Sequence, residues 1–537
     1  MRRILRSCVI AALTVAIAAA PTAAYAAPPS NDDLANATPI GMKNIINGTA
    51  QTENGPVTGV LEGNHYVYRG IPYAAPPVGD LRWRAPQPHA NWTSFNASAF
   101  GNTCPQLTGT GAFIGNEDCL TLNVWGPAAT PPKKLPVIVF LHGGGNSTFD
   151  AKGIPTFNTT GEYFAEHGAV LVSVNFRLGA LGFMAHSALS QENSDHISGN
   201  YGVMDQLAAL VWIQKNISGF GGDPKSITLY GFSAGAVDAC FLGAQRATSS
   251  LLKNLILSGT SHECDRPQTL AQALNTGNAE VQNAGCAGTA DVAACMRALP
   301  ASTIVAASPP TSAFASPSLW NPIVDNVLFD APLDALSRSS DVPRLLIGNT
   351  EDELGTFLAP STIPDDTAYA AQLYALFGQD LGDQVFAQYP SSAYPSPYRA
   401  YIAATSDFKF VCPARRIAKA FASASTVYRY LNTHALENPN PWVGRGAVHT
   451  SDLPFIFHTL GAGGLGYAGT AAEQTLSDTI AKIWITFAAV GHPHVPDLPP
   501  WLPYNVGTDP YLNINDTSQT AAGVHTANCN FWDGIDR

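Results

Sequence analysis

The chain has 537 residues, enough for one large domain or about three average ones, so length alone does not decide the number of domains. Apolar residues make up 46% of the chain and charged residues only 13%, a composition typical of a well-packed globular protein rather than a disordered one. The net charge of −12 argues against nucleic acid or an anionic membrane surface as a partner.

The N-terminus has the pattern of a secretory signal peptide. Arginines at positions 2, 3 and 6 precede an apolar run over residues 8–20, and Ala-Tyr-Ala at 24–26 supplies a small–x–small cleavage site. We therefore predict a signal peptide over 1–26 and a secreted mature protein, extracellular or periplasmic. The alternative is an uncleaved membrane anchor, but the apolar run is short for a membrane span.

The next segments predict an extension and a hairpin. Residues 27–55 are rich in Asn, Thr, Ala and Pro and are interpreted as a loose N-terminal extension. Alternating patterns over 57–61 and 65–69, separated by Glu-Gly-Asn, predict two strands joined by a tight turn.

The remaining pattern is one of strands alternating with helical segments. Residues 201–216 carry apolar side chains at helical spacing. Short apolar runs predict strands over 120–125, 136–141, 169–175, 226–230, 254–258 and 343–348. Such strands are typical of an α/β fold with a mostly parallel central sheet flanked by helices. No charge-rich or Ser/Gly linker divides the chain. The Ala/Pro-rich patch at 301–310 is a candidate boundary, but apolar order resumes at 317–325, so we expect a single domain over 27–537 with long loop and helical excursions.

Export makes the cysteine count informative, because disulfides persist in oxidising compartments. Eight of the 9 cysteines lie outside the predicted signal peptide, an even number that suits disulfides without fixing their connectivity. No C-x-x-C pair is present, and His492 and His494 lie in a proline-rich turn without other ligands nearby. We therefore predict no metal site and no cofactor.

The most informative motif is Gly-Phe-Ser-Ala-Gly over residues 231–235. It follows the strand predicted at 226–230 and precedes a helix start of small residues. In this context G-x-S-x-G is a nucleophile elbow, in which glycines allow a turn tight enough to expose the serine hydroxyl. The pattern predicts Ser233 as a nucleophile.

A glycine run after the strand at 136–141 is the second motif. In His142-Gly143-Gly144-Gly145, backbone N–H groups can approach a ligand without side-chain obstruction. The N–H groups of Gly144, Gly145 and Ala234 are predicted to form an oxyanion hole, the donor set that a serine nucleophile requires.

The acid and the base of such a site are less clear from local pattern. After the strand at 343–348 comes an acidic cluster in which Glu351, Asp352 and Glu353 are equal candidates. Six histidines lie beyond it, and the local sequence favours none of them as the base. These histidines are His434, His449, His458, His492, His494 and His525.

Several ordered motifs together resemble the type-B carboxylesterases, the cholinesterase/lipase branch of the α/β-hydrolases. The likeness runs from about Val57 to the C-terminus. The motifs are RGIPYAAPPVGDLRW at 69–83, EDCLTLNV at 117–124, GNYGVMDQ at 199–206, WIQKN at 212–216, FGGDP at 220–224, WLPY at 501–504 and CNFW at 529–532. The resemblance implies an α/β-hydrolase fold and a Ser233–Glu353–His449 triad that hydrolyses carboxylic esters through an acyl-enzyme.

The resemblance also implies three disulfides, namely Cys104–Cys119, Cys286–Cys295 and Cys412–Cys529. Cys240 and Cys264 are left over. We expect them to be buried free thiols, with a fourth bridge between them as the alternative.

The sequence departs from cholinesterases in two places. The loop between Cys104 and Cys119 is short and lacks a tryptophan, and Phe232 replaces the acidic residue before the serine. A quaternary ammonium gains little without an aromatic face or an anion, so we expect choline esters to be poor substrates. The short loop also argues against a lipase lid.

The predicted partner is a small-molecule ester, with no nucleic acid and no stable membrane anchor. The excursions around 107–115, 262–320 and 357–410 are expected to form the pocket walls, and a monomer is expected because no amphipathic tail is present. The alternatives are a lipase acting on longer-chain glycerides and a catalytically silent adhesion or binding relative.

Overall fold

The computed structural model describes residues 48–153, 158–245, 248, 250–310, 312–314, 318–336, 341–437, 440, 442–462, 466–496 and 498–535. The predicted signal peptide and most of the predicted extension therefore lie outside the described residues.

An 11-stranded sheet forms the centre of the described chain. Its strand order is β18-β17-β16-β15-β12-β11-β9-β10-β8-β4-β3. The seven strands from β17 to β10 are parallel, and β18, β8, β4 and β3 pair antiparallel at the two edges. The bounds are β3 Val60–Glu62, β4 His65–Pro72, β8 Thr121–Pro127, β9 Leu135–Leu141, β10 Val170–Val174, β11 Gly222–Phe232, β12 Asn254–Ser258, β15 Arg344–Thr350, β16 Val427–Asn432, β17 Pro510–Ile514 and β18 Gln519–Ala522.

Side-chain alternation along the strands builds one core on each face of the sheet. In β9, Val137 and Val139 belong to one core, whereas Ile138 and Phe140 belong to the other. Helices cover both faces, so neither set of apolar side chains meets water.

The helices divide into those that cover the sheet and those of the excursions. On one face lie α5 Tyr201–Asn216, α6 Ala234–Ala244 and α15 Cys412–Phe421, and on the other lie α16 Leu453–Ile456 and α17 Ala471–Val490. The remaining helices are α2 Glu162–Glu166, α3 Gly179–Phe183, α4 Ser187–Ser190, α8 Leu270–Asn283, α9 Val292–Ala298, α10 Ala301–Ala307, α11 Pro332–Leu336, α12 Asp366–Phe377, α13 Gln379–Gln388, α14 Pro397–Ser406 and α18 Thr526–Ile535. A π-helical turn at Asp407–Val411 joins α14 to α15.

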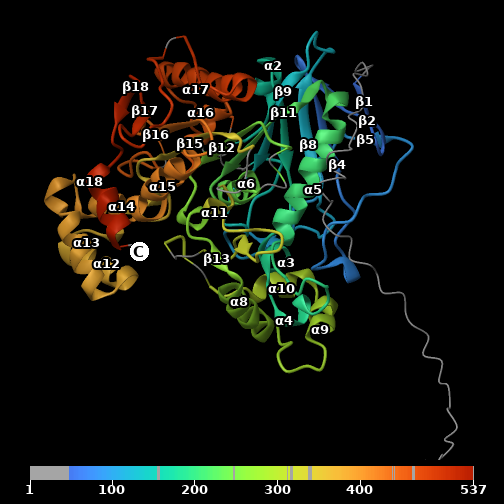
Figure 1. Ribbon diagram of the computed structural model, residues 1–537, viewed down its shortest axis with the longest axis horizontal. Helices are drawn as coiled ribbons and strands as arrows, with labels where there is room; N and C mark the ends of the chain where they lie inside the picture. The colour runs from blue at the N-terminus through green and yellow to red at the C-terminus, as the bar shows by residue number, and fades with distance from the viewer. Residues whose placement is uncertain are drawn as a thin grey trace, which may run out of the picture.

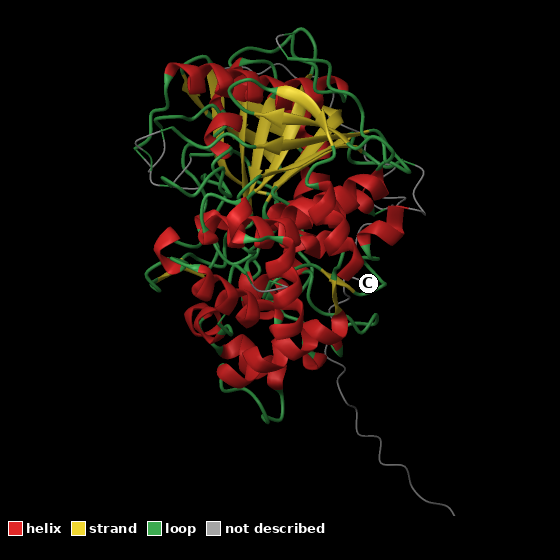
Figure 2. Cartoon of the chain, turned by 90° about the vertical axis from the view of Figure 1, so that its left-hand side faces the viewer, coloured by secondary structure: helices red, strands yellow, loops and turns green. Residues whose placement is uncertain are grey.

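Two excursions supply much of this helical mass. Helices α8, α9 and α10 lie together, and α12, α13 and α14 form a second group beside α18 (Figure 1). Figure 2 shows the sheet toward one end of the molecule and most helices gathered toward the other. No helix among the described residues is both long and apolar enough to span a membrane.

Short strands outside the central sheet form three small sheets among the described residues. They are β1 Thr49–Thr52, β2 Gly55–Thr58 and β5 Phe95–Asn96 in the first, β6 Gln106–Leu107 and β7 Phe113–Ile114 in the second, and β13 Gln268–Thr269 and β14 Ile323–Val324 in the third. The interpretation of 27–55 as a loose extension is therefore wrong for its last residues, because β1 pairs with β2.

The predicted hairpin forms with two differences. Strand β3 pairs with β4 from Val60↔Val67 to Glu62↔His65, so the turn contains only Gly63 and Asn64. The first half of the predicted strand instead belongs to β2, which pairs with β1 and β5 in a separate small sheet.

Four disulfides are present among the described residues, and Cys412–Cys529 joins segments 117 residues apart. Cys104–Cys119, Cys286–Cys295 and Cys412–Cys529 are the pairs that the family resemblance implies. Cys240 and Cys264 form the fourth bridge, so the expectation of free thiols is wrong. These two residues lie in α6 and in a 3₁₀ turn that follows β12, with Cα atoms 6.1 Å apart.

Candidate active site

Ser233 stands on a strained turn between β11 and α6. Its φ of 56° and ψ of −124° lie in a region of backbone conformation that residues other than glycine rarely adopt. A Cβ on Gly231 would lie 2.2 Å from the carbonyl oxygen of Gly235, so the turn cannot accept a larger residue there. This is the geometry of a nucleophile elbow, with Ser233 half-buried at the helix N-terminus.

The turn is held against neighbouring strands. The Ser233 N–H donates to the carbonyl of Ser258, at the end of β12, over 2.9 Å. A Cβ on Gly143 would lie 2.8 Å from the Cβ of Ser233, so the start of the glycine run directly abuts the serine.

His142 fixes the first peptide of the glycine run. Its Nδ1 donates to the carbonyl of Gly143 over 2.9 Å, and its ring stacks on Phe176 with centroids 4.7 Å apart. Burial lowers the pKa of His142, which favours the neutral ring. Because the peptide unit is planar and trans, fixing this carbonyl also fixes the opposite direction of the Gly144 N–H.

The second peptide of the run is fixed in the same way. The carbonyl of Gly144 accepts from the N–H groups of Ser147 and Thr148 over 3.0 and 3.1 Å. The N–H of Gly145 therefore points away from this turn. Ala234 is the first residue of α6, where an N–H has no intrahelical acceptor.

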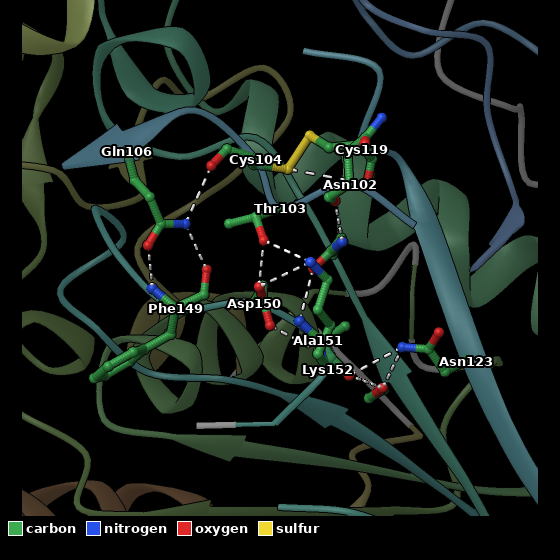
Figure 3. Close-up of polar contacts among 12 residues, drawn as sticks. Asn102, Thr103, Cys104, Gln106, Cys119, Asn123, Phe149, Asp150, Ala151 and Lys152 are labelled. Atoms are coloured by element: carbon green, nitrogen blue, oxygen red, sulfur yellow. Dashed lines mark hydrogen bonds and ion pairs between the residues drawn. A yellow bond between two sulfur atoms is a disulfide. The ribbon is translucent and has the colours of Figure 1, made fainter. Parts of the chain in front are cut away.

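Figure 3 shows how the chain after the glycine run is attached to the loop closed by Cys104–Cys119. The side chain of Gln106 accepts from the Phe149 N–H and donates to the Phe149 carbonyl, each over 2.8 Å. Thr103 donates to Asp150 over 2.6 Å. These contacts hold Phe149 at a φ of 75°, which an aromatic residue would not keep unaided.

The structure brings Glu353 and His449 together. Both side chains are buried, and the Nδ1 of His449 donates to Oε2 of Glu353. The other carboxylate oxygen, Oε1, accepts from the Thr350 N–H over 2.9 Å. The backbone N–H of His449 also donates to the backbone carbonyl of Glu353 over 3.1 Å, so these two residues are joined twice.

His449 lies beside the serine turn. Its ring stacks on Phe232, the residue before Ser233, with centroids 4.8 Å apart. A Cβ on Gly259, the residue after Ser258, would lie 2.9 Å from Cε1 of His449. The carboxyl end of β12 thus contacts both the serine turn and the imidazole.

The other two acidic candidates point elsewhere. Asp352 pairs with Arg399 over 2.8 Å, and burial raises the pKa of Asp352 to about 7 although Arg399 opposes this. Glu351 lies 3.8 Å from His525. Neither carboxylate contacts His449 in the described structure.

The remaining histidine candidates lie away from the serine turn. His434 pairs with Glu473 and Asp516, and His458 stacks on Tyr163 with centroids 4.2 Å apart. His525 bonds to Asp407 over 2.6 Å. His492 and His494 are exposed.

Aromatic rings and a further carboxyl surround His449. Phe410 and Phe357 have ring centroids 5.4 and 5.9 Å from the imidazole, and both come from the excursion over 357–410. Burial, reinforced by the charge of Glu353, raises the pKa of Asp452 to about 7, while His449 opposes the shift. The protonated form of Asp452 is therefore favoured at mildly acidic pH, which lowers the negative charge near Glu353 and His449.

A cavity of about 370 Å³ lies elsewhere, against one face of α5. Met204, Leu207 and Val211 line it, together with Tyr73 and Trp212. Ser233, Glu353 and His449 do not line this cavity, so it is not where an ester would meet the serine.

Sequence reasoning missed three polar residues around the glycine run, namely Gln106, Asn146 and Asp238. Asn146 donates to Asp238 over 3.0 Å. None of the three belongs to a recognised motif, and the sequence around each does not reveal its partner.

A mostly parallel sheet with a serine elbow after one central strand and a glycine run after its neighbour defines an α/β-hydrolase fold. The model of the carboxylesterase family matches residues 47–532, and the chain belongs to this family. It is therefore a carboxylic ester hydrolase.

Relatives and solved structures agree with this assignment. The chain is 34% identical over 462 residues to fumonisin B1 esterase of Sphingopyxis macrogoltabida, covering 82% of each chain. It is also 34% identical over 462 residues to para-nitrobenzyl esterase of Bacillus subtilis (strain 168), covering 82% of this chain and 90% of the relative. A solved PNB esterase superimposes with a TM-score of 0.76 at 29% identity, covering 91% of this chain and 100% of the other.

Proposed function

We propose that the protein is a secreted serine carboxylesterase in which Ser233, His449 and Glu353 form the catalytic triad. The observation that carries this proposal is the buried Glu353–His449 hydrogen bond, with the imidazole stacked on the residue that precedes Ser233. A serine needs an adjacent base to become a nucleophile at neutral pH.

The chemistry follows from these positions. Ser233 Oγ attacks the ester carbonyl carbon and its proton passes to Nε2 of His449, while Glu353 stabilises the imidazolium. The N–H groups of Gly144, Gly145 and Ala234 bind the oxyanion. When the tetrahedral intermediate collapses, the C–O bond to the alcohol breaks and the alcohol takes the proton from His449.

Water then repeats the sequence on the acyl-enzyme. His449 accepts a proton from water as the hydroxide oxygen attacks the acyl carbon, and the Ser233 oxygen leaves with that proton. The carboxylic acid product departs and the serine hydroxyl is restored. No cofactor or metal takes part in this scheme.

The aromatic residues near His449 favour esters with an apolar acyl or alcohol group. Phe357 is 49% exposed although it lies near the imidazole, so its face is available to a ligand. Phe232 offers no negative charge to a choline head group. The relative named as para-nitrobenzyl esterase supports an aromatic alcohol group as a starting point.

Secretion and domain organisation are part of the proposal. The signal pattern over 1–26 and the four disulfides support export to an oxidising compartment. The match to a single family model over 47–532 supports one domain over 27–537. We propose that the mature protein acts as a monomer.

The test is hydrolysis of p-nitrophenyl esters from acetate to palmitate by the purified mature protein and by Ser233→Ala. We expect activity on short and medium chains that is lost in the variant. A fluorophosphonate probe should label Ser233 in the wild type alone, as read by mass spectrometry of the tryptic peptide. A maximum at palmitate would favour the lipase alternative, and a folded protein without activity or labelling would favour the silent relative.

A further inference from the structure

A buried polar network links the glycine run to the nucleophile helix. The Nδ2 of Asn146, which directly follows Gly145, donates to Oδ1 of Asp238 over 3.0 Å. The other oxygen of Asp238 accepts from Nε2 of Gln206, in α5, over 2.6 Å. All three side chains are buried, so water does not compete for these bonds.

Asn146 is anchored at its backbone as well as at its side chain. Its φ of 52° lies in the left-handed region, which Asn adopts more readily than most residues. Its carbonyl accepts from the Gly179 N–H over 2.6 Å, and its amide also contacts the carbonyl of Trp320 over 3.4 Å. The position of Asn146 therefore sets the position of the Gly145–Asn146 peptide.

Asp238 is an unusual residue for its place. It is the only charged side chain of α6, whose described residues are all buried. Burial raises the pKa of Asp238 to about 7, and the hydrogen bonds from Gln206 and Asn146 oppose this shift. Placing a carboxyl here costs stability, since a desolvated charge gains little unless its partners are fixed.

The network spans the two halves of the proposed oxyanion hole. One half, Gly144 and Gly145, belongs to the loop that ends at Asn146, and the other half, Ala234, belongs to the helix that carries Asp238. The Asn146–Asp238 hydrogen bond is a direct side-chain link between the two.

We propose that Asn146 and Asp238 are positioning residues that set the spacing of the oxyanion-hole donors, and thereby the rate of ester hydrolysis. This inference rests on the proposed function, because it assigns a role within that same hole. Donors must lie within hydrogen-bond distance of the oxyanion itself, so small displacements reduce transition-state binding more than substrate binding.

The variants are chosen to separate positioning from folding. Asn146→Gly allows the left-handed backbone and removes the side chain that carries the amide, and Asp238→Ala removes the acceptor. Asp238→Asn keeps one acceptor oxygen for Asn146, and its own amide can donate to Gln206 after that side chain flips. The matched control is Asn254→Ala, a buried amide that bonds to Thr228, Phe487 and Ala488 at the opposite end of β12 from Ser258.

The measurements are kcat and KM for p-nitrophenyl acetate, Ki for a trifluoromethyl ketone that forms a tetrahedral oxyanion adduct, and Tm. For Asn146→Gly and Asp238→Ala we expect kcat to fall about 10- to 100-fold with KM within about 2-fold, and Ki to rise in parallel. Asp238→Asn should have a kcat within about 3-fold of the wild-type value. Asn254→Ala should have a lower Tm and an unchanged kcat.

Two outcomes would overturn the inference. One is that Asn146→Gly and Asp238→Ala lower Tm as Asn254→Ala does while kcat and Ki stay at wild-type values. The other is that Asp238→Asn loses as much activity as Asp238→Ala. The proposed function is tested separately. It is contradicted if the wild-type protein has no esterase activity or if Ser233→Ala keeps that activity, whatever the Asn146 and Asp238 variants do.

Discussion

The exchange of Glu353 for glutamine tests the proposed roles of Glu353 as the acid and His449 as the base. In the structure one carboxylate oxygen accepts from His449 and the other accepts from the Thr350 N–H. Glutamine has one acceptor oxygen and one NH₂ group, so it cannot satisfy both donors. The Thr350 N–H is fixed at the end of β15, whereas an imidazole can move its proton from one nitrogen to the other.

We therefore expect the glutamine oxygen to keep the Thr350 N–H and its amide to donate to Nδ1 of His449. The imidazole then carries its proton on Nε2, the nitrogen that should accept the proton of Ser233. The side chain keeps its shape, but the base is in the wrong tautomer. In serine hydrolases such an exchange costs about 10⁴ in kcat. We expect a loss of about 10³- to 10⁴-fold, which corresponds to roughly 4–5.5 kcal/mol of barrier.

The assay is steady-state hydrolysis of p-nitrophenyl acetate, with the fluorophosphonate labelling rate as an independent measure of Ser233 reactivity. KM should change little, because Glu353 is buried and is not available for contact with a substrate. Asp352→Asn is the matched control, since this neighbour pairs with Arg399 and should lower stability while kcat stays within a few-fold. The reasoning is refuted if Glu353→Gln keeps more than about a tenth of wild-type kcat, or if Asp352→Asn loses as much.

Two further predictions concern other contacts. Although burial opposes protonation, Asp407 and Glu351 raise the pKa of His525 to about 10, so its stabilising contribution is complete below its ordinary pKa of 6.5 and is lost as pH rises through 10. His525→Gln should therefore lower Tm by several degrees at pH 6 and much less at pH 10.5, and an equal loss at both would contradict this assignment. Gln106→Leu removes both hydrogen bonds to Phe149 and should lower kcat about 10-fold with intact disulfides, and unchanged kcat would show that the loop does not need this attachment.

Six strands of the central sheet were predictable because each is an apolar run that is mostly buried, namely β8, β9, β10, β11, β12 and β15. Strands β17 and β18 were not predicted, since most of their side chains are only partly buried or are exposed. The predicted strands at 120–125, 136–141 and 254–258 match β8, β9 and β12 to within about two residues, the usual uncertainty of element ends. Strand β16 was not predicted, because Arg429 interrupts its apolar pattern. That arginine is buried and pairs with Asp509 over 3.1 Å, a contact that only the fold creates.

The candidate site was likewise predictable only in part. The elbow and the glycine run are local features, because tight turns and close backbone approach require glycine at fixed positions. Glu351, Asp352 and Glu353 are adjacent in sequence, and only their partners distinguish them: His525, Arg399 and His449 respectively. Those partners come from segments about 50 to 170 residues away, a separation over which local pattern carries no information.

Helix α6 connects the parts that sequence patterns could not predict. Ser233 at its start holds a backbone conformation that costs about 1–3 kcal/mol and persists only where the surroundings fix it. Two residues of the helix supply that fixation: Asp238 bonds to the glycine loop and to α5, and Cys240 is joined covalently to Cys264. The Cys240–Cys264 disulfide, which cysteine spacing could not assign, and the Asn146–Asp238–Gln206 network, which belongs to no motif, thus both act on α6. Both therefore restrain α6, and we expect a helix released from them to shift and let the strained serine turn relax.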